Sequence, residues 1–380
     1  MRLNKIANLV LVISVLVVIV FVFGCKKQPA ASAAGPAFVP IDTSNLQLVA
    51  DTEEKERNAL EVEVRALARD GDFQKLESMA DEFRSSKSRF KNGAWKLKSF
   101  YFAFAHYQVI NDDAAYADLI SQLEHWASQQ PDSITPCLAL VEAYHGYAWI
   151  ARGAGTADTV TEKGEQLMEL RIEKSFEWLG KAGKLQARQK DPAFYATALH
   201  AFLGANVDRK VYEQVFDEGV TNAPDYSALY EYKAYYLFPR WYGQPGEWET
   251  YARKISERDD IPDHAEIYAR IALYLRDLGY FYQEFSGDDQ SWEELKSSFH
   301  AIEQDYPDSL EIKSICCLMA CKLYDYKEAR SQAKMLDGQV DLSVWTSQTD
   351  FLSAITWLNQ DDSTLESQRQ QYQAKQHQTN

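Results

Sequence analysis

The sequence predicts an all-α protein, built as a solenoid of paired antiparallel helices with essentially no sheet. Three observations lead to this prediction. Apolar residues recur at helical spacing through most of the chain, short turns join neighbouring helical segments, and Pro-Asp pairs recur where new helices should begin. Alternating apolar and polar runs bounded by turns, the usual sign of strands, do not occur in the sequence.

The composition is that of an acidic globular protein. The chain has 380 residues, of which 46% are hydrophobic and 25% are charged, enough to build a large core. Its first 27 residues contain four basic residues and no acidic ones, so the rest of the chain carries 36 basic and 56 acidic residues. A body with a net charge of −20 is not expected to attract a nucleic acid, and no such partner is predicted.

The N-terminus has the layout of an export signal. Arg2 and Lys5 precede an uncharged, apolar run over residues 6–24, which ends at Cys25. The tetrapeptide Val-Phe-Gly-Cys that ends there resembles the lipobox of bacterial lipoproteins, although Phe23 departs from its pattern of small residues. The resemblance implies lipidation of Cys25. The alternative is an uncleaved membrane helix, since the run approaches the ~20 residues that span a bilayer. Both alternatives predict a bacterial envelope protein that is anchored in a membrane, with its body outside the cytoplasm.

Four segments are therefore expected. Residues 1–25 are the lipoprotein signal or membrane anchor, and residues 26–50, rich in Ala and Pro, form a flexible tether. Residues 51–360 make up the helical repeat body. The last segment, 361–380, is rich in Gln and is predicted to be a frayed helix or a disordered tail.

Within the body, two turns have the same pattern. Gly71-Asp72-Phe73 and Asp325-Tyr326 each separate two stretches with apolar residues at helical spacing, so each predicts a helical hairpin. Both turns resemble that of a tetratricopeptide repeat. Pro-Asp pairs at 131, 224, 262 and 307, and a reversed pair at 191, mark further helix starts. Their spacing scatters around the tetratricopeptide period of about 34 residues, so we expect a tetratricopeptide-like solenoid.

The segment 226–248 is the most aromatic part of the body. Residues 226–237 are predicted to form a helix that is apolar on every side, and such a helix has neighbours all round. The loop 238–248 that follows contains Arg240, Trp241 and Trp248 and is too aromatic for an ordinary connection. These side chains are either folded back to fill a gap between repeats or exposed to grip a sugar or a peptide.

A second candidate loop follows another aromatic helix. It contains Arg152, Gly153 and Gly155, and His145 lies two turns earlier. Gly153 can end the helix, and a glycine-rich loop at the start of the next helix can hold an anion with help from Arg152. No Gly-Lys-Ser or Gly-Lys-Thr follows, so the loop is not a P-loop. The simpler alternative is a plain connection between helices, with His145 as a structural residue.

At these loops the chain resembles a known family. The motifs Arg152-Gly-Ala-Gly and Phe238-Pro-Arg-Trp, together with Trp95-Lys-Leu upstream, resemble the bacterial family called domain of unknown function 4034 over residues 55–275. The resemblance implies an all-helical, repeat-like body. The family has no assigned catalytic residues, so none is carried over.

Enzyme, cofactor and metal signatures are not found. The seven histidines are dispersed, and no nucleophile elbow or dinucleotide-binding loop occurs. No Cys-x-x-Cys pair supplies zinc spacing, and the thiols of residues 137, 316, 317 and 321 are expected to be buried. No catalytic residue, metal or cofactor is predicted, and enzymatic activity is left open, with a non-enzyme preferred.

Three functions fit these observations. The first is a non-enzymatic scaffold of the envelope that binds protein partners through an extended repeat surface. The second is a glycan-binding or glycan-cleaving helical toroid that uses the aromatic loop 238–248, with two acids nearby if it cleaves. The third is a single ligand site formed by the loops of Arg152 and Arg240, which requires that the two loops lie together.

Overall fold

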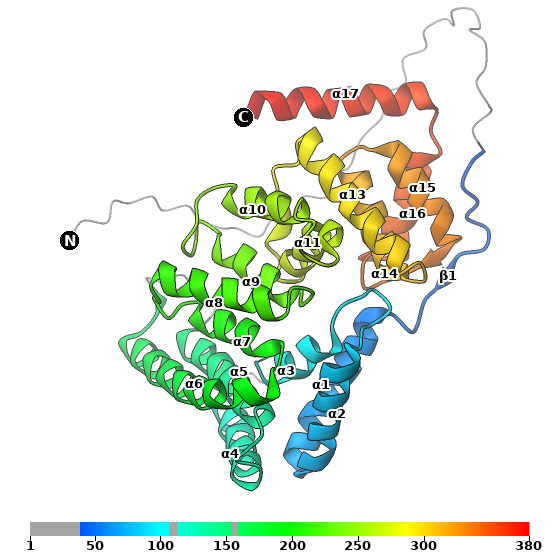
Figure 1. Cartoon of the computed structure of the whole chain (residues 1–380). Coiled ribbons are helices and arrows are strands. Elements are labelled where there is room, and N and C mark those ends of the chain that lie inside the picture. The colour runs from blue at the N-terminus through cyan, green and yellow to red at the C-terminus, as the bar shows by residue number, and fades with distance from the viewer. Residues whose placement is uncertain (1–38, 106–111, 154–158, 380) are drawn as a thin grey trace, which may run out of the picture. The chain divides into compact units, whose positions relative to one another are not determined.

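Helices provide almost all the regular structure of this computed structural model, which describes residues 39–105, 112–153 and 159–379 (Figure 1). The predicted N-terminal anchor, including Cys25, lies outside these residues. No helix within the described ranges is long and apolar enough to cross a membrane. The unit considered below is Pro40–Asn380.

The helices follow one another with short connections. In the first half they are α1 (Glu53–Asp70), α2 (Phe73–Ser86), α3 (Lys96–Ala105), α4 (Asp113–Gln129), α5 (Thr135–Arg152), α6 (Glu162–Gln189), α7 (Ala193–Phe202), α8 (Arg209–Asn222) and α9 (Ala228–Tyr236). In the second half they are α10 (Glu247–Ser256), the short 3-10 helix η2 (His264–Glu266), α11 (Ile267–Asp277), α12 (Phe281–Glu284), α13 (Asp289–Asp305), α14 (Leu310–Lys322), α15 (Tyr326–Leu336), α16 (Gln348–Leu358) and α17 (Asp362–Thr379). The prediction of an all-α helical repeat fold is confirmed.

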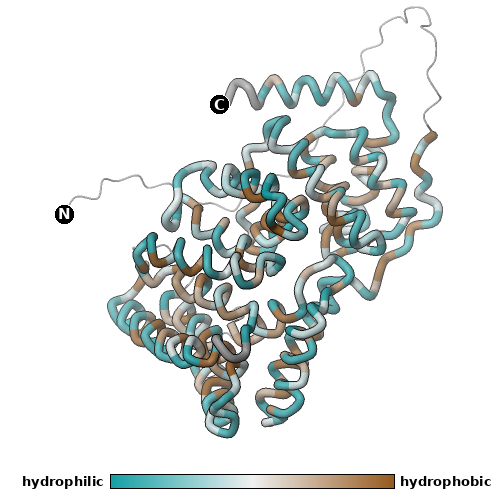
Figure 2. The backbone as a smooth tube through the Cα atoms, in the orientation of Figure 1, coloured by the Kyte–Doolittle hydropathy of each residue, from teal (hydrophilic) through white to brown (hydrophobic). Residues whose placement is uncertain are grey.

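The two predicted hairpins form as expected. Gly71 ends α1 in the left-handed conformation (φ 75°), and the Asp72 side chain caps the start of α2. At the second hairpin, the Asp325 side chain caps α15 in the same way. Along most helices, hydrophilic and hydrophobic residues alternate as one face turns toward the neighbouring helix (Figure 2).

A short parallel pair of strands joins the two ends of this unit. Strand β1 (Gln47–Leu48) pairs with β2 (Gln339–Val340), and the backbone of Ile41 exchanges two hydrogen bonds with the side chain of Asn359, at 2.8 and 3.1 Å. The predicted flexible tether is therefore wrong for residues 41–49. The Ala- and Pro-rich composition ends at Pro40, and the side chains of Ile41 and Leu46 after it pack against the core.

The C-terminal segment forms a helix. Of the two predicted alternatives for residues 361–380, α17 matches the helical one through Thr379. Its first turn is held rather than frayed, because Leu365 is fully buried. Further along, the ring of Tyr372 stacks on that of Tyr324 at 5.0 Å between ring centroids.

The predicted aromatic helix is α9, and it lies at the centre of the core. All nine of its residues are buried. Its rings pack against neighbouring helices, as when Tyr236 stacks on Tyr212 of α8 at 3.7 Å between ring centroids. The expectation of a helix with neighbours all round is confirmed.

An ionic network around the fully buried Asp191 ties four early helices together. Asp191, just before α7, has no exposed surface. Its Oδ2 accepts from Arg84 Nε and Nη2 of α2, at 2.9 and 2.6 Å, and from the Tyr101 hydroxyl of α3 at 2.7 Å. The Arg84 Nη2 also lies 3.2 Å from Thr135 Oγ1 at the start of α5. Each charge in this network is paired, as buried charges need to be.

A second network joins the N-terminal helix to α14. Arg57 of α1 forms a two-pronged ion pair with Glu311 of α14, at 2.6 and 2.8 Å. Asn92 also donates to Glu311. Glu53 accepts from the Glu311 backbone at 2.9 Å and from Ser309, and its burial, with Glu311 close by, raises its pKa to about 7. Below pH 7, Glu53 is therefore mostly protonated beside Glu311, whose pKa the ion pair with Arg57 lowers.

Candidate functional site

A cavity of about 1080 Å³ opens among helices that are far apart in the sequence. Its walls come from α1, α3, α5, α9 and α11, together with the loops after α5 and α9. Cavities of roughly 300–1,000 Å³ are typical of sites for small ligands. The volume therefore suits a small ligand or a short segment of a larger partner.

Most of the predicted site residues meet at this cavity. His145, Arg152, Gly153, Arg240 and Trp241 all contribute to its walls. The two candidate loops are thus on the same side, as the hypothesis of a shared site requires.

The remaining predicted residues have other placements. Trp248 does not line the cavity, because it is completely buried in the core and its indole N–H donates to the Glu284 carbonyl at 3.3 Å. Gly155 and Cys25 lie outside the described residues.

A row of four aromatic rings runs along the cavity wall. Trp149 meets Trp241 edge-on at 5.6 Å, Trp241 meets Tyr235 at 5.8 Å, and Tyr235 stacks on Tyr280 at 5.7 Å, all between ring centroids. We call these four residues the aromatic row. They come from α5, the loop after α9, α9 itself and the loop after α11, so packing of separate helices creates the row.

An arginine lies over each end of the aromatic row. The guanidinium of Arg152 is 5.5 Å from the centre of the Trp149 ring, and that of Arg240 is 4.4 Å from the centre of the Tyr280 ring. Both distances are those of cation–π contacts. Arg240 is exposed and forms no ion pair within the described part of the chain. The row thus ends in a cation on each side, and the exposed Arg240 can receive an anion or an oxygen acceptor.

His145 offers the cavity a hydrogen-bond donor. The Trp149 indole N–H donates to His145 Nε2 at 2.9 Å. An indole N–H can only donate, so Nε2 must be the acceptor and a neutral imidazole carries its proton on Nδ1. Burial, with a smaller effect of His200, lowers the pKa of His145 well below its usual value and keeps the ring neutral.

The Nδ1–H group of His145 is itself buried and finds no hydrogen-bond partner among the described residues. Such donors are rare, because an unpaired buried group costs about 1–3 kcal/mol. The Trp241 Nε1–H is a similar case: it is buried and makes no hydrogen bond of good geometry with a described residue. Both residues line the cavity, so an occupant with acceptor oxygens can satisfy both donors.

A second histidine supports His145 from behind. His200 lies 4.3 Å from His145 between ring centroids and stacks flat on Tyr232 at 4.7 Å. Its Nδ1 lies 2.8 Å from Oε2 of Glu142, and this hydrogen bond fixes the orientation of the His200 ring. The arrangement fixes both imidazoles by packing and hydrogen bonding, which preorganises the cavity wall.

Two acidic side chains of the cavity are held in ion pairs. Glu231 pairs with Lys98, and Glu311 pairs with Arg57. Lys98 also lies 4.5 Å from the centre of the Tyr274 ring. Three further carboxylates, those of Glu54, Glu61 and Asp277, line the same cavity.

Sequence reasoning missed part of this site. The sequence places Trp149 and Tyr235 in aromatic helices without assigning them to a site, and it singles out neither Tyr280 nor the pair of Lys98 and Glu231. The sequence shows that these helices are rich in aromatic residues, but the alignment of the rings depends on packing between α5, α9 and α11.

No family model, no curated protein and no solved structure matches this chain. The resemblance to domain of unknown function 4034 therefore stays a prediction. The site is characterised by its own geometry: an aromatic row with a cation at each end and a buried imidazole donor.

Proposed function

We propose that this chain is a non-enzymatic interaction module of the bacterial cell envelope, tethered to a membrane by its N-terminus, which holds a segment of a protein partner in the cavity. The observation that carries this proposal is the buried Nδ1–H of His145, which lines the cavity without an acceptor. A solenoid preorganised around such a donor is suited to binding rather than to bond cleavage.

The cavity chemistry specifies the partner segment. Backbone carbonyls or carboxylates would accept from His145 and Trp241, and a carboxylate would approach Arg240. The aromatic row supplies apolar area for flat or aliphatic side chains. The expected occupant is a short extended segment with an acidic residue or a free C-terminus.

Site-specific photo-crosslinking tests this proposal. A benzophenone amino acid in place of Leu278, which lines the cavity, should crosslink to one envelope protein in intact cells. The matched control replaces Met335 of α15, which is 45% exposed and not part of the cavity wall. The proposal predicts that Arg240→Ala abolishes the Leu278 crosslink. Crosslinks that are the same from both positions, or that survive Arg240→Ala, would contradict it.

Glycan binding is a second candidate, favoured by the aromatic row itself. Flat rings beside hydrogen-bond donors suit the apolar face and hydroxyl groups of a sugar. The paired carboxylates Glu231 and Glu311 favour binding over cleavage. A panel of envelope oligosaccharides, followed by tryptophan fluorescence, tests this candidate; a saturable change that is lost in Trp241→Ala supports it, and no change rejects it.

The tether has its own test. Metabolic labelling with a fatty acid should label the wild-type chain and not Cys25→Ala. Labelling of neither, with the chain still in the membrane fraction, would instead support an uncleaved membrane helix.

A further inference from the structure

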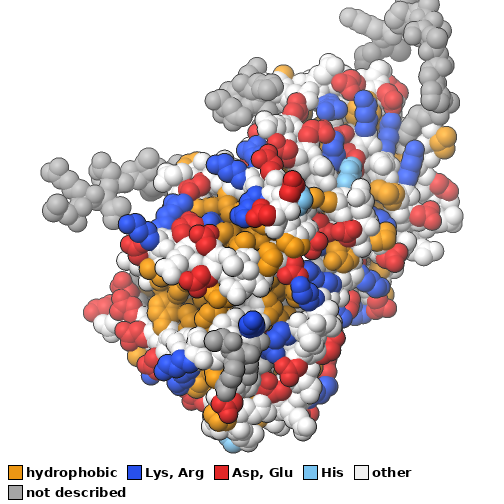
Figure 3. All heavy atoms as spheres, in the orientation of Figure 1, with side chains coloured by type: hydrophobic (Ala, Val, Ile, Leu, Met, Phe, Trp, Pro, Cys, Tyr) orange, Lys and Arg blue, Asp and Glu red, His pale blue; other side chains and the backbone are white. Residues whose placement is uncertain are grey.

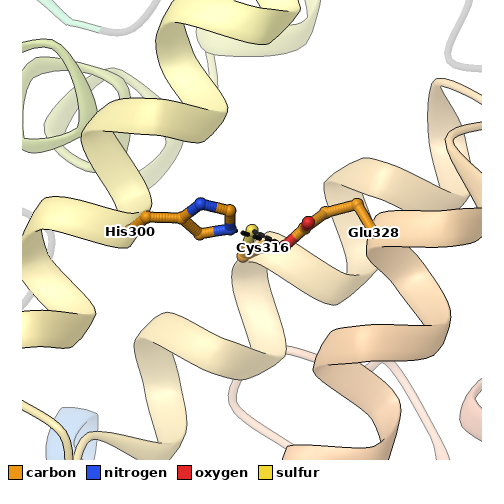
Figure 4. A group of neighbouring side chains, drawn as sticks. All are labelled: His300, Cys316 and Glu328. Carbon is orange, nitrogen blue, oxygen red and sulfur yellow. Dashed lines mark hydrogen bonds and ion pairs between the residues drawn. The ribbon is translucent and has the colours of Figure 1, made fainter.

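Three neighbouring helices bring a histidine, a cysteine and a glutamate together (Figure 4). None of the three lines the cavity described above. His300 comes from α13, Cys316 from α14 and Glu328 from α15. One nitrogen, one sulfur and one oxygen from these side chains all lie within 4.8 Å of one another. His300 Nε2 is 2.8 Å from Glu328 Oε1, and Cys316 Sγ is 3.7 Å from the same oxygen.

Two more polar side chains surround this group. Glu303 lies one helical turn after His300, and Gln332 lies one turn after Glu328, so both are on the facing sides of their helices. The Oε1 atoms of Glu303 and Gln332 are buried, and neither makes a hydrogen bond of good geometry with a described residue. The Gln332 amide donates instead to Glu328 Oε1 at 2.9 Å. The Glu303 carboxylate therefore adds a buried oxygen ligand beside the three ligand atoms.

The ligand atoms have separations that suit one small metal ion. Zinc binds His nitrogen and carboxylate oxygen at about 2.0–2.2 Å and Cys sulfur at about 2.3 Å in tetrahedral sites. Such bonds place ligand atoms roughly 3.3–3.8 Å apart. The sulfur–oxygen distance of 3.7 Å already fits, and the nitrogen–oxygen distance of 2.8 Å has to open by about 0.5 Å. The nitrogen and the sulfur lie within 4.8 Å of each other, so small side-chain adjustments bring all three atoms to one ion.

We propose that His300, Cys316 and Glu328 form a binding site for a zinc-class divalent cation, with Glu303 as an additional oxygen ligand. A mixed nitrogen, sulfur and oxygen set is characteristic of zinc, whereas magnesium and calcium prefer oxygen alone. On binding, the Cys316 S–H bond breaks, its proton goes to solvent, and the thiolate sulfur bonds the metal. The metal also replaces the proton on His300 Nε2, which otherwise lies against Glu328, and leaves a neutral ring that carries its proton on Nδ1.

The site also has a route for the ion and a structural role. The His300 side chain is 42% exposed, while Cys316 is fully buried, so the ion enters from the histidine side. Because each ligand comes from a different helix, a bound ion clamps α13, α14 and α15 against one another. This inference is independent of the cavity and of its proposed partner.

The test is a cobalt titration of the full-length, detergent-solubilised chain, kept reduced and stripped of metal beforehand. Co²⁺ is the probe because its bond to a thiolate gives a charge-transfer absorption band. The proposal predicts a band that saturates at one equivalent and is displaced by Zn²⁺. Cys316→Ser should lose the band, and Cys317→Ser, altered at the neighbouring buried thiol, should keep it.

A second variant keeps the test decisive if Cys316→Ser does not fold. His300→Gln changes a half-exposed residue, so folding should survive, and it should weaken Co²⁺ binding at least tenfold. Zn²⁺ should also raise the Tm of the wild type and not that of His300→Gln. The proposal is overturned if stoichiometric Co²⁺ gives no charge-transfer band, if Cys316→Ser retains the band, or if His300→Gln binds as tightly as the wild type.

Discussion

Two buried polar clusters in this protein are built on opposite principles. Around Asp191, the guanidinium of Arg84 and the hydroxyl of Tyr101 satisfy the carboxylate, and no gap remains. Around the cavity, His145 and Trp241 hold buried donors without acceptors among the described residues. The contrast teaches that burial alone does not mark a functional group. A satisfied network holds helices together, whereas an unsatisfied donor beside a cavity is a candidate for ligand binding.

The charge distribution on the surface also favours recognition at local sites over attraction by a general field. Acidic and basic side chains are interspersed over the visible face, with hydrophobic patches between them (Figure 3). Such a mixed surface favours solubility and does not create one attractive field. Recognition by this protein is therefore expected to depend on local sites.

The largest effect should come from breaking the satisfied network. Asp191→Ala leaves the Arg84 guanidinium buried without its main partner, and we expect a loss of about 3–5 kcal/mol in the free energy of unfolding. Urea denaturation followed by circular dichroism measures it. The control, Asp81→Ala, removes an exposed partner of the same arginine and should cost less than about 1 kcal/mol. Equal losses of unfolding free energy in the two variants would show that the buried partner of Arg84 contributes no more than the exposed one.

An intermediate effect is expected at Glu53. Its folded-state pKa of about 7 exceeds the ordinary value of 4.5, so the native chain holds an extra proton between these pH values. The stabilisation of the folded state by this proton is complete below pH 4.5 and is lost as the pH rises toward 7 and beyond. From pH 4.5 to 8, the wild type should lose about 2–3 kcal/mol relative to Glu53→Gln. Parallel pH profiles of the two proteins would show that Glu53 ionises normally.

His145→Phe should have a smaller cost for folding and a large one for binding. The variant removes the acceptor of the Trp149 indole, so we expect a loss of about 1–2 kcal/mol in unfolding free energy. The crosslink from position 278 should disappear. Urea denaturation and crosslinking of the same preparation separate the two effects, and a retained crosslink would show that the imidazole is only structural.

Arg240→Ala should leave stability within about 0.5 kcal/mol of the wild type, because its side chain is exposed and lacks an ion pair among the described residues. Binding should nevertheless be lost. Arg258→Ala is the matched control, since it removes another surface arginine, one that pairs with Asp260 and is not part of the cavity wall. If both variants bind normally, the cation at the end of the aromatic row has no role in recognition.

Local parts of this fold were predictable from the sequence, and long-range parts were not. The turns at Gly71 and Asp325 and the buried helix α9 follow from local propensity and apolar spacing. The placement of Arg152 and Arg240 at one cavity depends on how successive helices are stacked, which no local pattern encodes. Trp248 resembled a site residue because it shares a loop with Trp241, and only packing shows that it belongs to the core.

The same limit explains the missed metal-ligand group. His300, Cys316 and Glu328 lie on three different helices, so their sequence spacing resembles no zinc motif. The predicted tether extends to residue 50, but the Ala- and Pro-rich composition ends at Pro40. Residues after Pro40 pair with segments near the C-terminus, and the local sequence does not encode this pairing. Each error concerns a contact between distant segments.

The most direct measurement is long-range ¹H–¹⁵N NMR of the full-length chain labelled with ¹⁵N-histidine, with His145 assigned by comparison with His145→Phe. The structure predicts a neutral His145 ring protonated on Nδ1, and it predicts that this state persists below pH 6.5, where an ordinary imidazole is at least half charged. An Nε2-protonated ring, or titration near the usual pKa, would contradict the claim that His145 presents a fixed, unpaired donor to the cavity.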